Sequence, residues 1–200
     1  MVGILVLPQK PLTLKGVIST KKLLNTIFKI QVTDNRLKIY RMVIDQLDSC
    51  LSSNILAVHQ YLSTNHSPRQ NSADNLKSFK AKHFNDKASD GLNIIVFDKY
   101  LEIFPEFIEH EQKINSDVAK LLLTAWHLIK ARREIAELIG SYKQVHQLKI
   151  KDEQRWANAL ANKLTFFSTE NIELSKIKKF WDQVHEVSCN IQQKIIENKP

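Results

Sequence analysis

One long helix is predicted by the sequence SDVAKLLLTAWHLIKARREIAELIGSYKQVH, residues 116–146. Its apolar residues recur every three to four positions, which is the period of an α-helix. Ser116 can cap the helix through its hydroxyl, and Asp117 stands beside the positive end of the helix dipole. We therefore expect an amphipathic helix of about eight turns, which sets the length of the fold.

One seam of this helix is apolar except for two cations. Steps of four and three residues trace the seam through Val118, Leu122, Ala125, Ile129, Arg132, Ala136, Ile139 and Lys143. Arg132 and Lys143 are eleven residues apart, which at about 100° per residue brings both side chains to nearly the same face. The helix is thus predicted to turn two positive charges toward the protein interior.

Two further helices are expected downstream. The first follows Ile150, with Asp152 at its start, and its buried side is predicted to be Ala157, Leu160, Leu164 and Phe166. The second covers about 172–198, and its apolar stripe is Ile177, Phe180, Trp181, Val184, Val187, Ile191 and Ile195. Ser188 and Gln192 lie one turn apart on the edge of that stripe. Along the chain, the three predicted helices are therefore long, medium and long.

The buried cations of these helices indicate a binding site for a ligand. Arg132 and Lys143, a third cation from Arg155, and the polar groups of Ser188 and Gln192 would line one cavity with too few acids to neutralise it. Burying such charges costs several kcal/mol unless they have partners. We therefore expect an anionic ligand to supply these partners.

Composition supports an all-α fold and argues against other classes. The 200 residues are 43% hydrophobic, with only 4 Gly and 5 Pro, which favours a globular, mostly helical chain. The net charge of +8 arises mainly from residues 1–105, with 14 Lys and Arg against 8 Asp and Glu. This excess is diffuse, and the sequence has no recognisable helix that could read a nucleic-acid groove, so we expect no nucleic-acid partner.

No apolar run approaches the ~18 residues of a membrane span, so no membrane contact is expected. The histidines show no metal-ligand spacing.

The chain divides near Pro105. Residues 1–105 are expected to be a mainly helical extension of unknown role, with a helix at about 36–63 and a mobile or poorly packed segment at about 63–91. Residues 106–200 carry the three helices described above. They are expected to form the functional domain.

The carboxy-terminal part resembles the all-α chorismate mutases. The resemblance covers about residues 107–200 and rests on Arg132-Arg133-x-Ile135-Ala136, Tyr142-Lys143, Ile150-x-Asp152-x-x-Arg155, Phe180-Trp181-x-Gln183-Val184 and Ser188-x-x-Ile191-Gln192. The Tyr-Lys pair and the Phe-Trp run are most similar to the subgroup that is often exported. The sequence shows no export signal, so we expect a cytoplasmic protein, with a periplasmic location as the alternative that this resemblance leaves open.

The resemblance implies an isomerase of aromatic amino acid biosynthesis in the shikimate pathway, which rearranges chorismate to prephenate without a cofactor. It implies that Arg132 and Arg155 grip the two carboxylates, and that Lys143 and Gln192 donate to the ether oxygen whose bond breaks. Asp152 would lie near the ring hydroxyl and Ser188 near a carboxylate. Because an amide donates at any ordinary pH, Gln192 predicts little change in kcat between about pH 5 and 8.

Two positions depart from the family pattern. Trp156 stands where many members have a glutamate that binds the ring hydroxyl. The further arginine that members bring to the pocket is also missing, and Lys113 is our candidate for its place. Arg41 begins Arg41-x-x-Ile44-Asp45-x-Leu47-Asp48, which faintly resembles the first helix of dimeric members; we attribute this to chance.

Three functions are possible for the whole chain. An active chorismate mutase is the main one, and a catalytically weak or inactive mutase-fold module for binding or regulation is the alternative. A basic nucleic-acid binder is the third and has only the charge of residues 1–105 behind it. We expect a homodimer, because three helices close a pocket poorly, whereas residues 36–63 could instead close it within a monomer.

Overall fold

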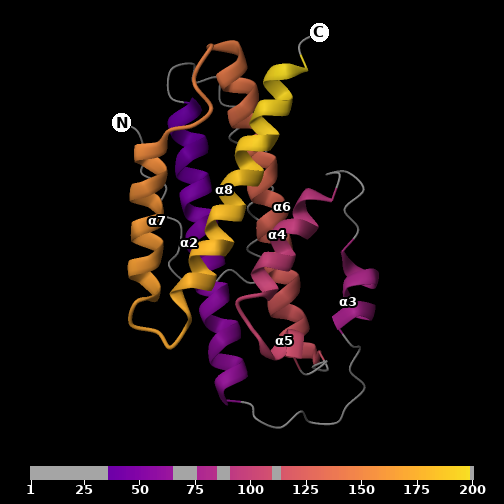
Figure 1. The fold of residues 1–200 in the computed structure, drawn as a ribbon. Helices are drawn as coiled ribbons and strands as arrows, with labels where there is room; N and C mark the ends of the chain where they lie inside the picture. Colours follow the sequence, from indigo (N-terminus) through magenta and orange to yellow (C-terminus); the bar gives the residue numbers. More distant parts are fainter. Residues whose placement is uncertain (1–35, 65–75, 85–90, 110–113, 199–200) are drawn as a thin grey trace, which may run out of the picture.

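The structure, a computed structural model, describes residues 36–64, 76–84, 91–109 and 114–198. These residues form helices joined by loops (Figure 1). The all-α fold class is therefore confirmed for the described part of the chain. Residues 1–35, which gave no firm sequence prediction, lie outside it.

The three predicted downstream helices are present as α6 (Ser116–Val145), α7 (Glu153–Phe167) and α8 (Leu174–Glu197). Ser116 is not the cap of α6, contrary to the prediction. The Asn115 side chain accepts hydrogen bonds from the backbone N–H groups of Asp117 (3.1 Å) and Val118 (3.0 Å). An amide oxygen one residue upstream thus satisfies the first free amides. Asp152, which was predicted at the start of α7, caps that helix by accepting from the Arg155 N–H at 3.1 Å.

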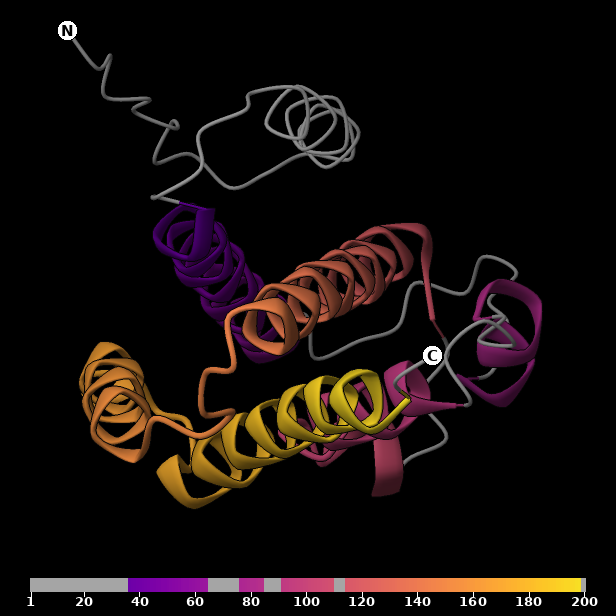
Figure 2. The ribbon, with the colours of Figure 1, turned by 90° about the horizontal axis from the view of Figure 1, so that it is seen from above.

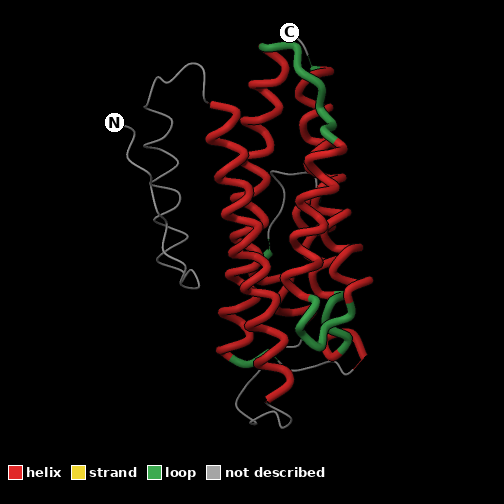
Figure 3. Tube along the Cα trace, turned by 90° about the vertical axis from the view of Figure 1, so that its left-hand side faces the viewer, coloured by secondary structure: helices red, strands yellow, loops and turns green. Residues whose placement is uncertain are grey.

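Helix α6 lies at the centre of the fold and packs against α2 (Arg36–Thr64), α4 (Leu92–Leu101) and α8. Helix α2 runs in the opposite direction to α6, whereas α8 runs in the same direction (Figure 1). Figure 3 shows these long helices extending along a common direction. The helix predicted at about 36–63 therefore forms one wall of the bundle.

Helix α7 is the least buried of the long helices, and it packs against α8. Its buried side was predicted incorrectly in part: Phe166 is 46% exposed, and the neighbouring Phe167 is fully buried. Leu160 and Leu164 are only partly buried against the core, and Ala157 is exposed. Its apolar contacts are with α8, and ion pairs from Arg155 and Lys163 join it to α2.

Of the segment at about 63–91 that was predicted to be mobile or poorly packed, residues 65–75 and 85–90 lie outside the described part of the chain, whereas residues 76–84 are packed on the core. They contain α3 (Leu76–His83), in which Phe79 is buried. The following Phe84 places its ring 4.4 Å from Phe97 of α4 and 4.6 Å from Trp126 of α6, measured between ring centroids. These aromatic contacts hold a short helix whose sequence is otherwise polar.

The hydrophobic core continues across residue 105 without interruption. Buried residues of α2 and α4 belong to the same cluster as those of α6 and α8, and the short helix α5 (Glu106–Glu109) lies between α4 and α6 in the chain. The described residues upstream of 105 are therefore part of one core with those downstream. Within the described ranges, none of the helices is both long and apolar enough to cross a membrane.

Candidate active site

A polar cavity lies between α2, α6, α7 and α8, next to the loop that joins α6 to α7. Figure 2 shows these helices from above, with α2 and α7 both toward the left of the view. The cavity volume is about 70 Å³, room for several water molecules. Six predicted site residues line it: Arg132, Lys143, Asp152, Arg155, Ser188 and Gln192. The seventh, Lys113, lies outside the described residues.

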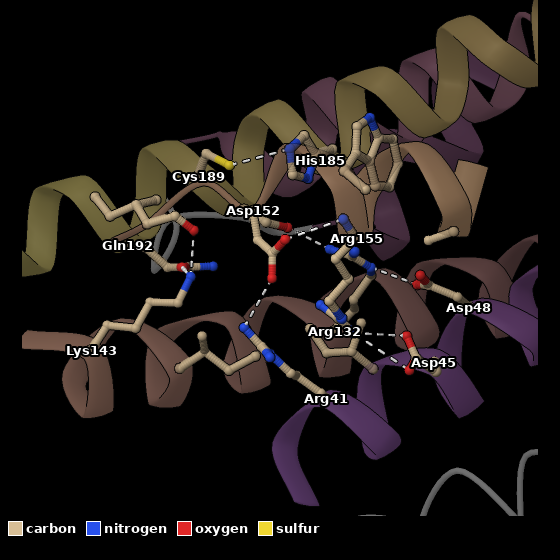
Figure 4. A pocket seen from close by; sticks show the side chains of 16 residues that line it. Arg41, Asp45, Asp48, Arg132, Lys143, Asp152, Arg155, His185, Cys189 and Gln192 are labelled. Carbon is tan, nitrogen blue, oxygen red and sulfur yellow. Dashed lines mark hydrogen bonds and ion pairs between the residues drawn. The ribbon is translucent and has the colours of Figure 1, made fainter. Parts of the chain in front are cut away.

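Lys143 and Gln192 face each other from α6 and α8 (Figure 4). The Lys143 ammonium donates to Gln192 Oε1 at 2.9 Å and to the backbone carbonyl of Ile150. Both side chains are buried. Because Oε1 is held by the lysine, the amide N–H groups of Gln192 are turned away from it and remain available as donors. Two donors from different helices thus lie side by side.

The pKa of Lys143 is shifted by this environment. Burial lowers it from the ordinary lysine value, and the positive charges of Arg41 and Arg155 lower it further, while Cys189 and Asp152 oppose the shift. A desolvated ammonium also exerts a stronger field on a neighbouring oxygen than one in water. Lys143 is therefore a strong electrostatic donor for as long as it keeps its proton.

Arg132 is fixed by three groups. Its Nε donates to Asp48 Oδ1 at 2.6 Å, and its Nη1 donates to the Ser188 hydroxyl and, at 3.5 Å, to the Val184 carbonyl. The second oxygen of Asp48 forms an ion pair with Lys163 at 3.0 Å. Arg132 and Asp48 are only 7% and 3% exposed, so this network is sheltered from solvent screening.

Arg155 and Arg41 make two more accessible ion pairs. Arg155 Nη2 contacts Asp45 Oδ1 at 3.1 Å, and Arg41 Nη2 contacts Asp152 Oδ2 at 3.5 Å. The four side chains are between 33% and 59% exposed. Both pairs join α2 to the start of α7 across the cavity (Figure 4). Such exposed pairs contribute about 0–1 kcal/mol each, so a ligand can compete for either arginine.

The cavity contains acids that the sequence analysis did not place there. Helix α2 brings Asp45 and Asp48 to the cavity, and Asp152 adds a third carboxylate. Four Arg and Lys residues line the same cavity, namely Arg41, Arg132, Lys143 and Arg155. Four cations against three acids leave a formal charge of +1 before Lys163 is counted. The cavity therefore still favours an anion. An anionic ligand would mainly take the place of aspartates that already pair with the arginines.

Arg41 lines the cavity, although the sequence analysis attributed the family likeness of its motif to chance. The spacing of residues in the sequence could have indicated this position. Arg41, Ile44, Asp45 and Asp48 follow the steps of one helical face, so a helix that buries Ile44 and Asp48 turns Arg41 toward the same interior. What the sequence did not show was that this face meets α6 and α7.

Trp156 also lines the cavity, where it stacks on His185 with ring centroids 4.2 Å apart and an interplanar angle of 5°. His185 Nε2 lies 3.6 Å from Cys189 Sγ. Burial and the nearby Arg132 lower the pKa of His185, and burial raises the pKa of the Cys189 thiol. At neutral pH this wall of the cavity is uncharged, in contrast to the arginine side.

Comparison with protein families gives a match to chorismate mutase type II over residues 124–193. It identifies a chorismate mutase type II domain in the carboxy-terminal part of the chain, from within α6 to within α8. No curated protein and no solved structure matches the chain. The matched residues include Arg132, Lys143, Arg155 and Gln192 but none of α2.

Proposed function

We propose that this protein is a chorismate mutase, which converts chorismate to prephenate by an intramolecular Claisen rearrangement. The observation that carries the proposal is the meeting of Lys143 and Gln192, two buried donors joined at 2.9 Å, in one cavity with Arg132 and Arg155. The family match over residues 124–193 supports it.

The chemistry requires positioning and electrostatics only. The rearrangement is unimolecular, so the protein supplies neither a nucleophile nor a cofactor. Arginines that grip the two carboxylates hold chorismate in its compact, reactive conformer. Lys143 and the amide of Gln192 donate to the ether oxygen, where negative charge develops as the C–O bond breaks. Asp152 or its neighbouring backbone would contact the ring hydroxyl.

Arg41 is the proposed second carboxylate clamp, in place of Lys113. It belongs to α2 and reaches the cavity within the same chain. A guanidinium binds a carboxylate through two parallel hydrogen bonds, which an ammonium cannot do. Carboxylates of chorismate would then replace Asp152 at Arg41 and Asp45 at Arg155, with Arg132 contacting one of them.

A cavity completed by α2 does not need a second chain. The predicted homodimer was based on the three downstream helices alone, and residues of α2, the helix considered as the monomeric alternative, line the cavity in this chain. We therefore propose that the active form is a monomer. Sedimentation velocity at the enzyme concentration of the assay measures this directly, and turnover that depends on dimer formation would contradict it.

The test follows chorismate absorbance after adding purified protein. The parent should turn over chorismate, and Arg132→Ala and Lys143→Ala should each lower kcat/KM at least ~100-fold, since each removes a charged donor. The matched control is Lys120→Ala, which removes a highly exposed α6 lysine and should leave the rate unchanged. Absence of turnover by the folded parent would sink the proposed enzymatic function.

A mutase-fold binding module is the second candidate. It is favoured by Trp156 in the position of the expected glutamate and by the occupation of Arg155 and Arg41 by the protein's own carboxylates. This candidate predicts that prephenate binds, by calorimetry, while chorismate is not consumed. The two functions are thus separated by one pair of measurements on the parent protein.

A further inference from the structure

We propose that Asp48 is the positioning residue for Arg132, and that α2 thereby supplies part of the catalytic machinery from outside the matched family domain. This inference rests on the proposed function, in which Arg132 holds a substrate carboxylate. It assigns a specific task to a helix whose role the sequence left open. The geometry of the guanidinium group carries it.

A guanidinium is planar and has three nitrogens, so two firm contacts fix its orientation. Asp48 holds Nε at 2.6 Å, and Ser188 and the Val184 carbonyl hold Nη1. In the described part of the chain, no hydrogen bond is found for Nη2. The contacts on Nε and Nη1 therefore leave Nη2 as the nitrogen that can present its N–H groups to a ligand.

Asp48 is itself held from its other side. Its Oδ2 pairs with Lys163 at 3.0 Å, and the same ammonium lies 4.6 Å from the ring centroid of the fully buried Trp181. The Asp48 carboxylate is thus fixed between the Arg132 guanidinium and the Lys163 ammonium, which lies over the Trp181 ring. With both oxygens engaged and only 3% of the residue exposed, Asp48 has little freedom to turn away.

Asp45, one turn earlier on α2, provides the contrast. It pairs with Arg155, but its side chain is 59% exposed, so solvent and ligands can compete for that arginine. Two aspartates of one helix therefore have opposite tasks. Asp45 occupies Arg155 only until the substrate binds, whereas Asp48 keeps hold of Arg132 throughout and pre-organises it.

Chemical rescue tests this assignment. Arg132→Ala leaves the Asp48 carboxylate and the Ser188 hydroxyl facing the space of the lost guanidinium. Guanidinium chloride at tens of millimolar should then raise kcat/KM of Arg132→Ala at least ~10-fold, because the site that oriented the arginine orients the free ion. Urea, which is planar but neutral, is the matched reagent control and should give no rescue. Rescue should also be absent in the Arg132→Ala/Asp48→Asn double variant, and equal rescue with and without Asp48 would overturn the proposal.

A second variant tests the same role of Asp48 if the double variant does not fold. Lys163→Met keeps the apolar contact with Trp181 but removes one of the two cations that hold Asp48, so kcat/KM should fall ~3-fold to 30-fold in protein that circular dichroism shows to be folded. Lys178→Met is the control, because it removes an exposed α8 lysine that pairs with Asp182. Unchanged kcat/KM in Lys163→Met would contradict a positioning role.

Failure of the proposed function has a different signature. If the parent binds prephenate without consuming chorismate, the enzymatic function fails, and rescue is measured as recovery of prephenate binding by guanidinium. Recovery that requires Asp48 still supports the positioning role. A parent that neither consumes chorismate nor binds prephenate overturns both proposals together.

Discussion

Gly140 lies directly against the backbone of Gln192. A Cβ placed on Gly140 would come within 3.1 Å of Gln192 Cα and 3.0 Å of Ile195 Cδ1. The absence of a side chain at position 140 therefore lets α6 and α8 approach closely, one turn before Lys143. This close approach sets the distance between Lys143 and Gln192.

Gly140→Ala is expected to destabilise the protein and slow the reaction. Alanine favours a helix interior by up to about 1 kcal/mol over glycine, but overpacking against a neighbouring backbone costs about 1–3 kcal/mol. We expect overpacking to win, with a net loss of about 1 kcal/mol in the free energy of unfolding and a lower kcat. Urea denaturation and kinetics measure the two effects. Ser141→Ala, an exposed neighbour on α6, is the control, and a stabilised, fully active Gly140→Ala would show that the close approach of the helices does not depend on this contact.

Arg41→Ala is expected to weaken substrate binding. Hydrogen bonds to charged groups contribute about 1.5–3 kcal/mol, which corresponds to an increase in KM of roughly 10-fold to 100-fold. Arg41→Lys should lie between the parent and alanine, because it keeps the charge but not the paired hydrogen bonds. Lys38→Ala removes an exposed cation of the same helix and controls for general charge. An unchanged KM in Arg41→Ala would remove Arg41 from the site.

Asp45→Asn is expected to strengthen substrate binding. The variant frees Arg155 from an exposed ion pair worth at most about 1 kcal/mol, so KM should fall by no more than about 5-fold with little change in kcat. The difference from the parent should shrink at high salt, which screens exposed pairs. Asp182→Asn, in the exposed pair with Lys178, is the control. A higher KM in Asp45→Asn would mean that Asp45 assists binding.

The dependence of kcat on pH should be flat on the acidic side and fall on the alkaline side. Gln192 does not titrate, so little change is expected between about pH 5 and 8. Lys143 donates only while protonated, and its pKa is lowered by burial and by Arg41. The alkaline decline should therefore begin at a lower pH than for an ordinary lysine. Lys143→Arg should remove this decline, since an arginine keeps its proton.

Circular dichroism over the same pH range separates titration from unfolding. A steep loss of kcat between about pH 5 and 8 in the folded protein would contradict the role of Gln192. The matched variant Gln192→Glu should show such a loss, because a carboxyl must be protonated to donate.

The helices α6, α7 and α8 could be predicted because their sequence patterns are local. The period of α6 and α8 and the start of α7 at Asp152 follow from residue spacing alone, since a helical face is a property of neighbours in the chain. The spacing from Arg132 to Lys143 likewise places both cations on one face of α6. The cap of α6 and the buried phenylalanine of α7 were each wrong by one residue, because helix ends depend on local hydrogen bonds and packing.

Tertiary structure alone decided which charges meet. Asp48 is 84 residues from Arg132, and Asp45 is 110 residues from Arg155, so no local pattern links them. Their pairing depends on how α2 packs against α6 and α7, which is a matter of long-range burial. By itself the sequence determined an all-α chain with a row of cations suited to an anion. The fold determined that α2 supplies the acids that hold Arg132 and Arg155 and the arginine proposed as the second clamp, because burial brings distant side chains together and requires buried charges to be paired.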